Sequence, residues 1–204
     1  MDNNEADFDE LIKLIIIGDT YVGKTNYLHR FVEGDFNTVY EATVGFDFKS
    51  KICKLPKCQK VVKFQMWDTA GTEKYMAINQ SLFQKVQGII LMYDITQIKT
   101  FNNLEKWMAK IKEIASGIPL ILIGNKIDLE NERKVSKEKG EEFANKYKIL
   151  FFESSGKNGV NVEESFFALG EEIIKSNISI SKHASENIIS IDTTPANKTK
   201  KICC

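Results

Sequence analysis

The chain has 204 residues, of which 43% are hydrophobic and 27% charged, and this composition excludes a chain that is disordered throughout. The formal net charge is zero, so nothing at the level of the whole chain indicates nucleic acid or another polyanion as a partner. Four unevenly placed cysteines exclude the disulfide framework of a small secreted domain, and a reducing compartment is expected.

The first residues, MDNNEADFDE, lack the basic and apolar pattern of a signal peptide and the glycine after Met1 that N-myristoylation requires. The apolar runs, such as residues 14–17, are far shorter than the roughly 20 residues that cross a bilayer. We therefore expect a cytosolic chain unless its other end is modified.

Apolar runs of strand length alternate with helical patterns along the chain. Five runs are typical of strands covered on both faces, namely LIKLIIIG, KVVKFQMWD, GIILMYDI, IPLILIGNK and ILFFESS, which start at residues 11, 60, 88, 118 and 149. Apolar residues at helical spacing predict helices within residues 27–32, 101–114, 143–147 and 162–174. Residues 43–68 predict a β-hairpin, because FDFKSKICKL alternates, PKCQ turns and a second strand returns. The fold class is therefore α/β, a three-layer domain with one antiparallel element.

The segment GDTYVGKT, residues 18–25, lies between the first predicted strand and the first predicted helix, and it fits the phosphate-loop pattern G-x-x-x-x-G-K-[ST]. Backbone N–H groups of such a loop, with the positive end of the helix, surround phosphate oxygens. Lys24 would reach the β and γ phosphates, and Thr25 would place its hydroxyl on Mg²⁺. The loop alone indicates a nucleoside triphosphate and leaves the base open.

The base is indicated by NKID, in which Asn125, Lys126 and Asp128 follow the strand PLILIG. The Asp128 carboxylate can accept hydrogen bonds from N1–H and the exocyclic amine of guanine, whereas adenine presents a lone pair there. Losing two charge-assisted bonds of about 1.5–3 kcal/mol each would select guanine by orders of magnitude. Lys126 would lie along the base, and Asn125 would tie this segment to the phosphate loop.

With both motifs present, the chain resembles a small GTPase of the Ras superfamily and is similar in detail to the Rab family. The resemblance covers residues 9–176 and the terminus, and it rests further on TVGFDF, WDTAG, YDIT with FNNLEKW, and the final Cys-Cys. It implies a P-loop GTPase domain over residues 9–176, with a mostly parallel six-stranded sheet and one antiparallel strand. Residues 177–204 would form a flexible tail, since they show no sustained hydrophobic period.

The resemblance assigns roles to individual residues. Thr43 would bind Mg²⁺ and the γ-phosphate, Asp68 would hold Mg²⁺ through water, and Gly71 would donate its N–H to the γ-phosphate. Hydrolysis would involve Lys24, Thr43, Gly71 and the water-orienting position, Thr72. The nucleotide-binding positions taken together are Asp19, Tyr21, Val22, Gly23, Lys24, Thr25, Phe36, Thr43, Gly71, Asn125, Lys126, Asp128, Ser155, Gly156 and Lys157.

Recognition of the base would also involve Phe36 and the segment ESSGK. Phe36 would stack on the guanine. Ser155, Gly156 and Lys157 would support the base, with the Gly156 N–H directed at guanine O6. Gly156 stands where the family has alanine, so a looser loop is expected here.

The resemblance implies a switch, because γ-phosphate and Mg²⁺ order the segments around Thr43 and Gly71 and hydrolysis releases them. It implies a monomer that regulates vesicle traffic, with effectors, an exchange factor, a GTPase-activating protein, the Rab escort protein and GDI as partners and no nucleic acid. Phe48 and Trp67 match two aromatic residues that the family uses for partner recognition. Residues 82–86, LFQKV, depart from the family's Tyr-Tyr-Arg-Gly-Ala.

Cys203 and Cys204 follow three lysines near the end of the chain. In the Rab family such a pair carries two geranylgeranyl groups, and two lipid chains give a stable anchor where one is marginal. We therefore expect the protein on the cytoplasmic face of intracellular membranes, with a soluble cytosolic pool.

Thr72 stands where the family has the glutamine that orients the attacking water. Threonine is shorter, and its single hydroxyl cannot both donate to the γ-phosphate and accept from a water at the glutamine's reach, so slow intrinsic hydrolysis is expected. Only two of the 28 basic residues are arginine, Arg30 and Arg133, and neither lies near Thr72 in the sequence. An activating protein would have to supply the missing groups. The alternative is a scaffold that stays GTP-bound and recruits partners without cycling.

Thr20 and Tyr21 occupy phosphate-loop positions where relatives carry small residues. Tyr21 can still donate its backbone N–H to phosphate if its ring points outward, where the ring would slow nucleotide exchange or obstruct an incoming arginine.

A small-molecule kinase that uses the same loop is a further alternative, although NKID has no role in one. A zinc site at Cys53 and Cys58 is another, although no second Cys or His pair lies nearby.

Overall fold

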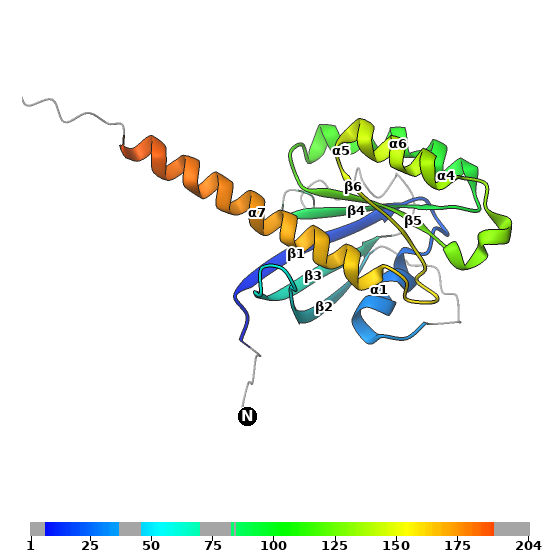
Figure 1. Ribbon diagram of the computed structural model, residues 1–204, viewed down its shortest axis with the longest axis horizontal. Coiled ribbons are helices and arrows are strands. Elements are labelled where there is room, and N and C mark those ends of the chain that lie inside the picture. Colours follow the sequence, from blue (N-terminus) through cyan, green and yellow to red (C-terminus); the bar gives the residue numbers. More distant parts are fainter. Residues whose placement is uncertain (1–6, 37–45, 70–82, 84, 190–204) are drawn as a thin grey trace, which may run out of the picture. The chain divides into compact units, whose positions relative to one another are not determined.

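The computed structural model describes residues 7–36, 46–69, 83 and 85–189 (Figure 1). Five residues to which the sequence assigns a role lie outside this described part, namely Thr43, Gly71, Thr72, Cys203 and Cys204. The chain divides into two units, Met1–Ile173 and Ile174–Cys204.

Six strands form one sheet in the order β2-β3-β1-β4-β5-β6. Their bounds are β1 Glu10–Gly18, β2 Phe46–Lys54, β3 Val61–Thr69, β4 Gly88–Asp94, β5 Leu120–Asn125 and β6 Leu150–Ser154. β2 and β3 pair antiparallel, with Phe48 opposite Trp67, and the other neighbours pair parallel. The prediction of a mostly parallel six-stranded sheet with one antiparallel hairpin is confirmed.

Helices cover both faces of the sheet, which gives the three layers that the sequence predicts (Figure 1). Their bounds are α1 Lys24–Glu33, α4 Ile98–Asn102, α5 Leu104–Ile114, the 3₁₀-helix η1 Ile127–Glu132, α6 Lys137–Tyr147 and α7 Val162–Ile189. The helices α4, α5 and α6 lie on one side of the sheet, and α1 with the first turns of α7 lies on the other.

The central strand β1 is apolar over residues 14–17 because both of its faces are buried there. Ile15 and Ile17 belong to the core that Trp107 of α5 and Phe143 of α6 complete. On the opposite face, Phe31 of α1 stacks on Phe166 of α7, with ring centroids 3.8 Å apart. This packing fixes the strands, and ligands of open α/β sheets bind beyond the carboxyl ends of such strands. The loops that follow β1, β5 and β6 carry the predicted nucleotide motifs at this edge.

The last helix is longer than the sequence pattern predicts. A flexible tail was expected from residue 177, but α7 is continuous to Ile189. Residues 171–189 contain neither glycine nor proline, so no residue in this stretch breaks a helix. None of the helices in the described ranges is long and apolar enough to cross a membrane.

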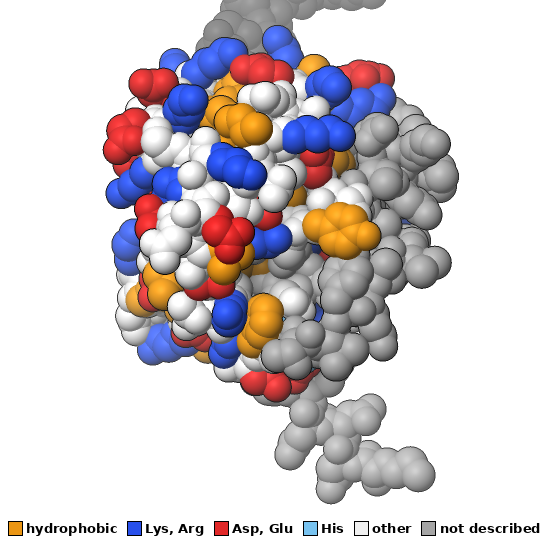
Figure 2. Space-filling view, turned by 90° about the vertical axis from the view of Figure 1, so that its right-hand side faces the viewer, with side chains coloured by type: hydrophobic (Ala, Val, Ile, Leu, Met, Phe, Trp, Pro, Cys, Tyr) orange, Lys and Arg blue, Asp and Glu red, His pale blue; other side chains and the backbone are white. Residues whose placement is uncertain are grey.

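Figure 2 shows one face of the molecule, on which acidic and basic side chains are interspersed with small apolar groups. This mixture agrees with the formal net charge of zero.

Candidate nucleotide-binding site

The loop between β1 and α1 requires glycine at both of its ends. Gly18 has φ +138°, and a Cβ there would lie 2.3 Å from the Met92 carbonyl oxygen of β4. Gly23 has φ +95°, and a Cβ there would lie 2.6 Å from the Asn125 side-chain nitrogen. The two glycines therefore let the loop pass close to β4 and to the end of β5. The loop leads directly into α1, so its backbone N–H groups lie at the N-terminus of this helix, where an anion can bind.

Lys24 is the first residue of α1, and its side chain is only 6% exposed. Its Nζ donates to the carbonyl oxygens of Gly18 at 3.0 Å and Asp19 at 2.9 Å. Burial lowers the pKa of Lys24 to about 8, against the opposing effect of the Asp68 and Asp19 carboxylates. A phosphate group at this loop would favour the charged form of the lysine.

Thr25 and Asp68 meet at the same end of the sheet. The Thr25 hydroxyl, in the first turn of α1, donates to Asp68 Oδ2 near the end of β3 at 2.5 Å. Asp68 is 1% exposed. A hydroxyl and a carboxylate are the hard oxygen donors that Mg²⁺ prefers, so the residues present fit this ion.

The Asp19 side chain is directed at α5. Its Oδ2 accepts from Asn103 Nδ2 at 2.7 Å, and its Oδ1 accepts from Trp107 Nε1 at 2.8 Å. The carboxylate also lies at the N-terminal end of α5, where the helix dipole favours negative charge. The sequence places Asp19 among the nucleotide-binding residues. Because both carboxylate oxygens are bonded to other side chains, only the backbone of Asp19 is available for that role. The segment FNNLEKW contained the signal for this contact.

Tyr21 has the left-handed φ of +67°, which is uncommon for a residue other than glycine. Its side chain is 67% exposed, as the sequence argument requires for a loop that still presents its backbone. Its carbonyl oxygen accepts a 2.8 Å hydrogen bond from Lys126 Nζ.

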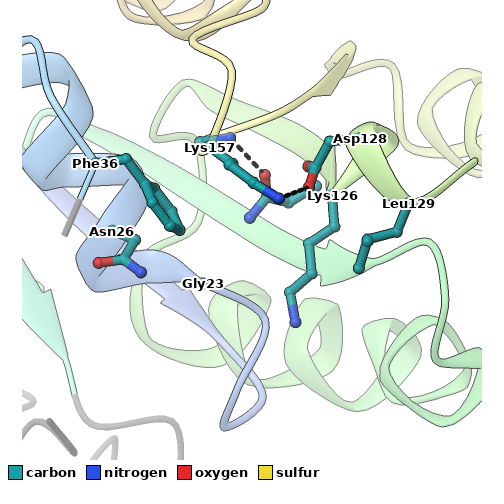
Figure 3. Close-up of a pocket in the computed structure, with 9 residues that line it drawn as sticks. Gly23, Asn26, Phe36, Lys126, Asp128, Leu129 and Lys157 are labelled. Atoms are coloured by element: carbon teal, nitrogen blue, oxygen red, sulfur yellow. Dashed lines mark hydrogen bonds and ion pairs between the residues drawn. The ribbon is translucent and has the colours of Figure 1, made fainter. Parts of the chain in front are cut away.

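A cavity of about 390 Å³ lies beside the phosphate loop (Figure 3). It is lined by Gly23, Asn26, Phe36, Asn125, Lys126, Asp128, Leu129, Gly156 and Lys157. Seven of these nine residues are sequence-predicted site residues, and the sequence missed the other two. Asn26 follows Thr25 in α1, and Leu129 follows Asp128. Their positions directly after motif residues could have indicated that they line the same site.

Asn125 holds the cavity together. The residue is 3% exposed, and its Nδ2 donates to the Val22 carbonyl oxygen at 2.8 Å. Its Oδ1 accepts from the Gly156 N–H at 3.1 Å. One side chain at the end of β5 therefore connects the phosphate loop with the loop after β6.

Lys126 and Asp128 occupy one side of the cavity, and the Phe36 ring faces it from the other (Figure 3). The Lys126 ammonium group pairs with Asp94 Oδ2 at 2.7 Å. Asp128 Oδ1 accepts from the Ser155 hydroxyl at 2.6 Å, and Oδ2 lies 4.0 Å from Lys157 Nζ. The carboxylate is thus oriented by two residues of the loop after β6, and a flat base can lie between Phe36 and Lys126.

The Ras family model matches residues 13–175. Ras-related protein Rab-13 of Rattus norvegicus is 45% identical over 168 residues, 82% of each chain. Ras-related protein Rab-10 of Diplobatis ommata is 42% identical over 198 residues, 97% of each chain. This chain belongs to the Rab family of Ras-like small GTPases. Ras-related protein Rab-8B of Homo sapiens is a further similar protein, at 45% identity over 168 residues, 82% of this chain and 80% of the relative.

Membership of the Rab family supports GTP hydrolysis, binding of guanine nucleotide with Mg²⁺, and regulation through effectors and regulators. It excludes the small-molecule kinase as an alternative. The zinc alternative gains nothing, because Cys53 and Cys58 are free thiols, and the described residues contain no group of three or more metal-binding side chains.

Proposed function

We propose that this Rab-family GTPase is a GTP- and GDP-dependent switch in intracellular vesicle traffic, and that its intrinsic hydrolysis is slow. The observation that carries the nucleotide assignment is the Asn125 amide, which bonds to Val22 and to Gly156. It connects the loop that would bind the phosphates with the loop that would bind the base, so both would contact the same nucleotide.

The phosphate side of the site would use the loop backbone at Asp19, Tyr21, Val22 and Gly23, together with the Lys24 ammonium group. Thr25 and Asp68 would hold Mg²⁺, Thr25 through its hydroxyl and Asp68 through water. Mg²⁺, when bound, would neutralise charge on the β and γ phosphates. Lys24 would complement the same charge from a buried position, where electrostatic interactions are stronger than in water.

The base side would use Asp128 as the acceptor for guanine N1–H and the exocyclic amine. Ser155 and Lys157 orient this carboxylate. The Gly156 N–H donates to Asn125 Oδ1 in this structure, and it would share or give up that hydrogen bond to donate to guanine O6 when the base binds. Phe36 and the Lys126 stem would cover the two faces of the ring.

Slow hydrolysis follows from the residue at position 72. Thr43 and Gly71 would sense the γ-phosphate, so the two nucleotide states would still be distinguished. Thr72 would leave the attacking water poorly held. Prompt termination would then depend on an activating protein that supplies an arginine and a glutamine.

Partner binding and membrane attachment complete the proposed cycle. Phe48 is 47% exposed on β2 and packs edge-on against Trp67 of β3, with ring centroids 5.4 Å apart. This aromatic pair supports a surface for effectors. The protein would be a monomer, delivered by the Rab escort protein and GDI, with Cys203 and Cys204 geranylgeranylated at the cytoplasmic face of intracellular membranes.

Single-turnover hydrolysis tests the proposal. GTP-loaded protein and its Thr72→Gln variant are compared, each with and without a Rab-activating domain. We expect Thr72→Gln to hydrolyse bound GTP about 30-fold or more faster, since positioning of the water by one side chain is worth about 2 kcal/mol or more. Equal rates would refute the role given to Thr72, and failure to retain GTP would refute the nucleotide assignment.

The second candidate is a GTP-bound scaffold that does not cycle, and Thr72 is the observation that favours it. The two candidates differ in the nucleotide that the freshly purified protein carries. If the protein carries mostly GTP and an activating domain does not accelerate hydrolysis, the scaffold is the better description. If the freshly purified protein carries mostly GDP, the GTP- and GDP-dependent switch is the better description.

A further inference from the structure

We propose that Arg30 is a positioning residue for base recognition, whose guanidinium group holds two walls of the guanine cavity together. The inference rests on the proposed nucleotide binding. It adds a residue from the last turn of α1, outside the motifs that would bind the nucleotide.

Arg30 donates to three backbone carbonyl oxygens. Its Nε donates to Gly156 at 3.0 Å and its Nη2 to Lys157 at 2.5 Å, both in the loop after β6. Its Nη1 donates to Gly34 at 2.7 Å, just past the end of α1. A guanidinium group presents its donors in a rigid plane, so these three bonds fix the two segments relative to each other.

The two segments that Arg30 joins form different parts of the cavity. Gly156 and Lys157 line it directly. Gly34 lies two residues before Phe36, whose ring faces the cavity from α1's side (Figure 3). The segment of Gly156 and Lys157 and the end of α1 that leads to Phe36 are therefore bonded to the same side chain.

Local backbone geometry makes this connection consequential. Gly34 has the left-handed φ of +81° and donates its N–H to the Arg30 carbonyl oxygen at 3.0 Å, which ends α1. Gly156 has no side chain of its own to restrain the loop. Two of the three acceptors of Arg30 are thus glycines, which have more backbone freedom than other residues.

Lys51 provides a matched control. Its Nζ also donates to a carbonyl oxygen in the last turn of α1, that of Phe31 at 2.5 Å. Its other hydrogen bond in the described part of the chain is to Glu163 at 3.1 Å, away from the residues that line the cavity. Replacing Lys51 therefore removes a cation from the end of α1 and leaves both cavity walls bonded.

The test measures release of a fluorescent GDP analogue from full-length protein, chased with excess GDP. We expect Arg30→Met to accelerate release about tenfold, because charge-assisted bonds to both walls are lost. Arg30→Lys, which can bond to only one wall at a time, should give a smaller increase. Lys51→Met should release the analogue at the wild-type rate. Single-turnover GTP hydrolysis should be unchanged in all variants, since the phosphate side is untouched.

Each other outcome counts against the proposal. Wild-type release from both Arg30 variants would overturn it. So would an equal acceleration by Lys51→Met, or a parallel loss of hydrolysis, because either indicates general loosening of the domain. If Arg30→Met does not fold, Arg30→Lys decides the question. A wild-type protein that does not retain GDP would contradict the proposed function and not the role of Arg30.

Discussion

The Thr25 hydroxyl donates to Asp68 Oδ2 at 2.5 Å, which joins the first turn of α1 to the end of β3. Thr25→Val keeps the shape of the side chain and removes the hydroxyl. We expect the Mg²⁺ concentration needed to slow GDP release to rise about tenfold or more. A titration of the release rate against MgCl₂ measures this, and release in EDTA should be the same for both proteins. An unchanged midpoint would show that Thr25 is not a ligand.

Tyr93 and Tyr27 form a contrasting pair of buried tyrosines. The Tyr93 hydroxyl has no hydrogen-bond partner among the described residues, whereas the Tyr27 hydroxyl lies 2.5 Å from Ser165 Oγ. We expect Tyr93→Phe to leave the free energy of unfolding unchanged or raise it by about 1 kcal/mol. Tyr27→Phe should lower it by about 1 kcal/mol, because Ser165 loses a partner. Urea unfolding in excess GDP compares the two variants, and equal losses would contradict the assignment.

Replacing Gly156 by alanine tests stability at a second place in the site. Its φ lies outside the left-handed region, and an added Cβ would meet its nearest atom, Tyr27 Cα, at 3.4 Å, an ordinary contact. Gly156→Ala should therefore raise the free energy of unfolding by about 0.4–1 kcal/mol, because the unfolded chain loses freedom. It should also slow GDP release, since the base-binding loop becomes stiffer. A destabilised variant would mean that the loop cannot accept the Cβ.

The lowered pKa of Lys24 predicts that nucleotide binding depends on pH. Burial lowers its pKa to about 8 from the ordinary lysine value of 10.5, so above pH 8 the lysine of the free protein is increasingly neutral. Bound phosphate favours the ammonium form and raises this pKa again. Binding of GDP should therefore take up protons at pH 9 and few at pH 7. Calorimetry in two buffers of different ionisation enthalpy detects the uptake. Lys24→Arg is charged at both pH values and should abolish it, and a buffer-independent enthalpy at pH 9 for the wild type would refute the prediction.

Much of the fold and part of the site could be predicted from the sequence, because their signals are local. The apolar run of β1, the glycine loop and the start of α1 all lie within residues 10–25, and each constrains the next. The hairpin of β2 and β3 is equally local. NKID follows a buried strand, which places Asn125 and Asp128 at the carboxyl edge of the sheet.

Other features depend on contacts between distant segments. Arg30 looks like an ordinary polar residue of an amphipathic helix, and two of its three acceptors lie 126 and 127 positions further along the chain. The Asp19 carboxylate accepts hydrogen bonds from Asn103 and Trp107, although its position in the phosphate loop suggested that Asp19 contacts the nucleotide. The length of α7 was missed for another reason, since its later residues lack an apolar stripe while still containing no helix breaker.

The hydrogen bond between Trp107 Nε1 and Asp19 makes the indole a natural optical probe of the phosphate loop. Indole emission responds to the polarity and charge around Nε1, and Asp19 is a backbone neighbour of the phosphate-binding groups. The chain contains only one other tryptophan, Trp67. In a Trp67→Phe background, the intrinsic fluorescence of Trp107 would follow loading and release of unmodified nucleotide in real time.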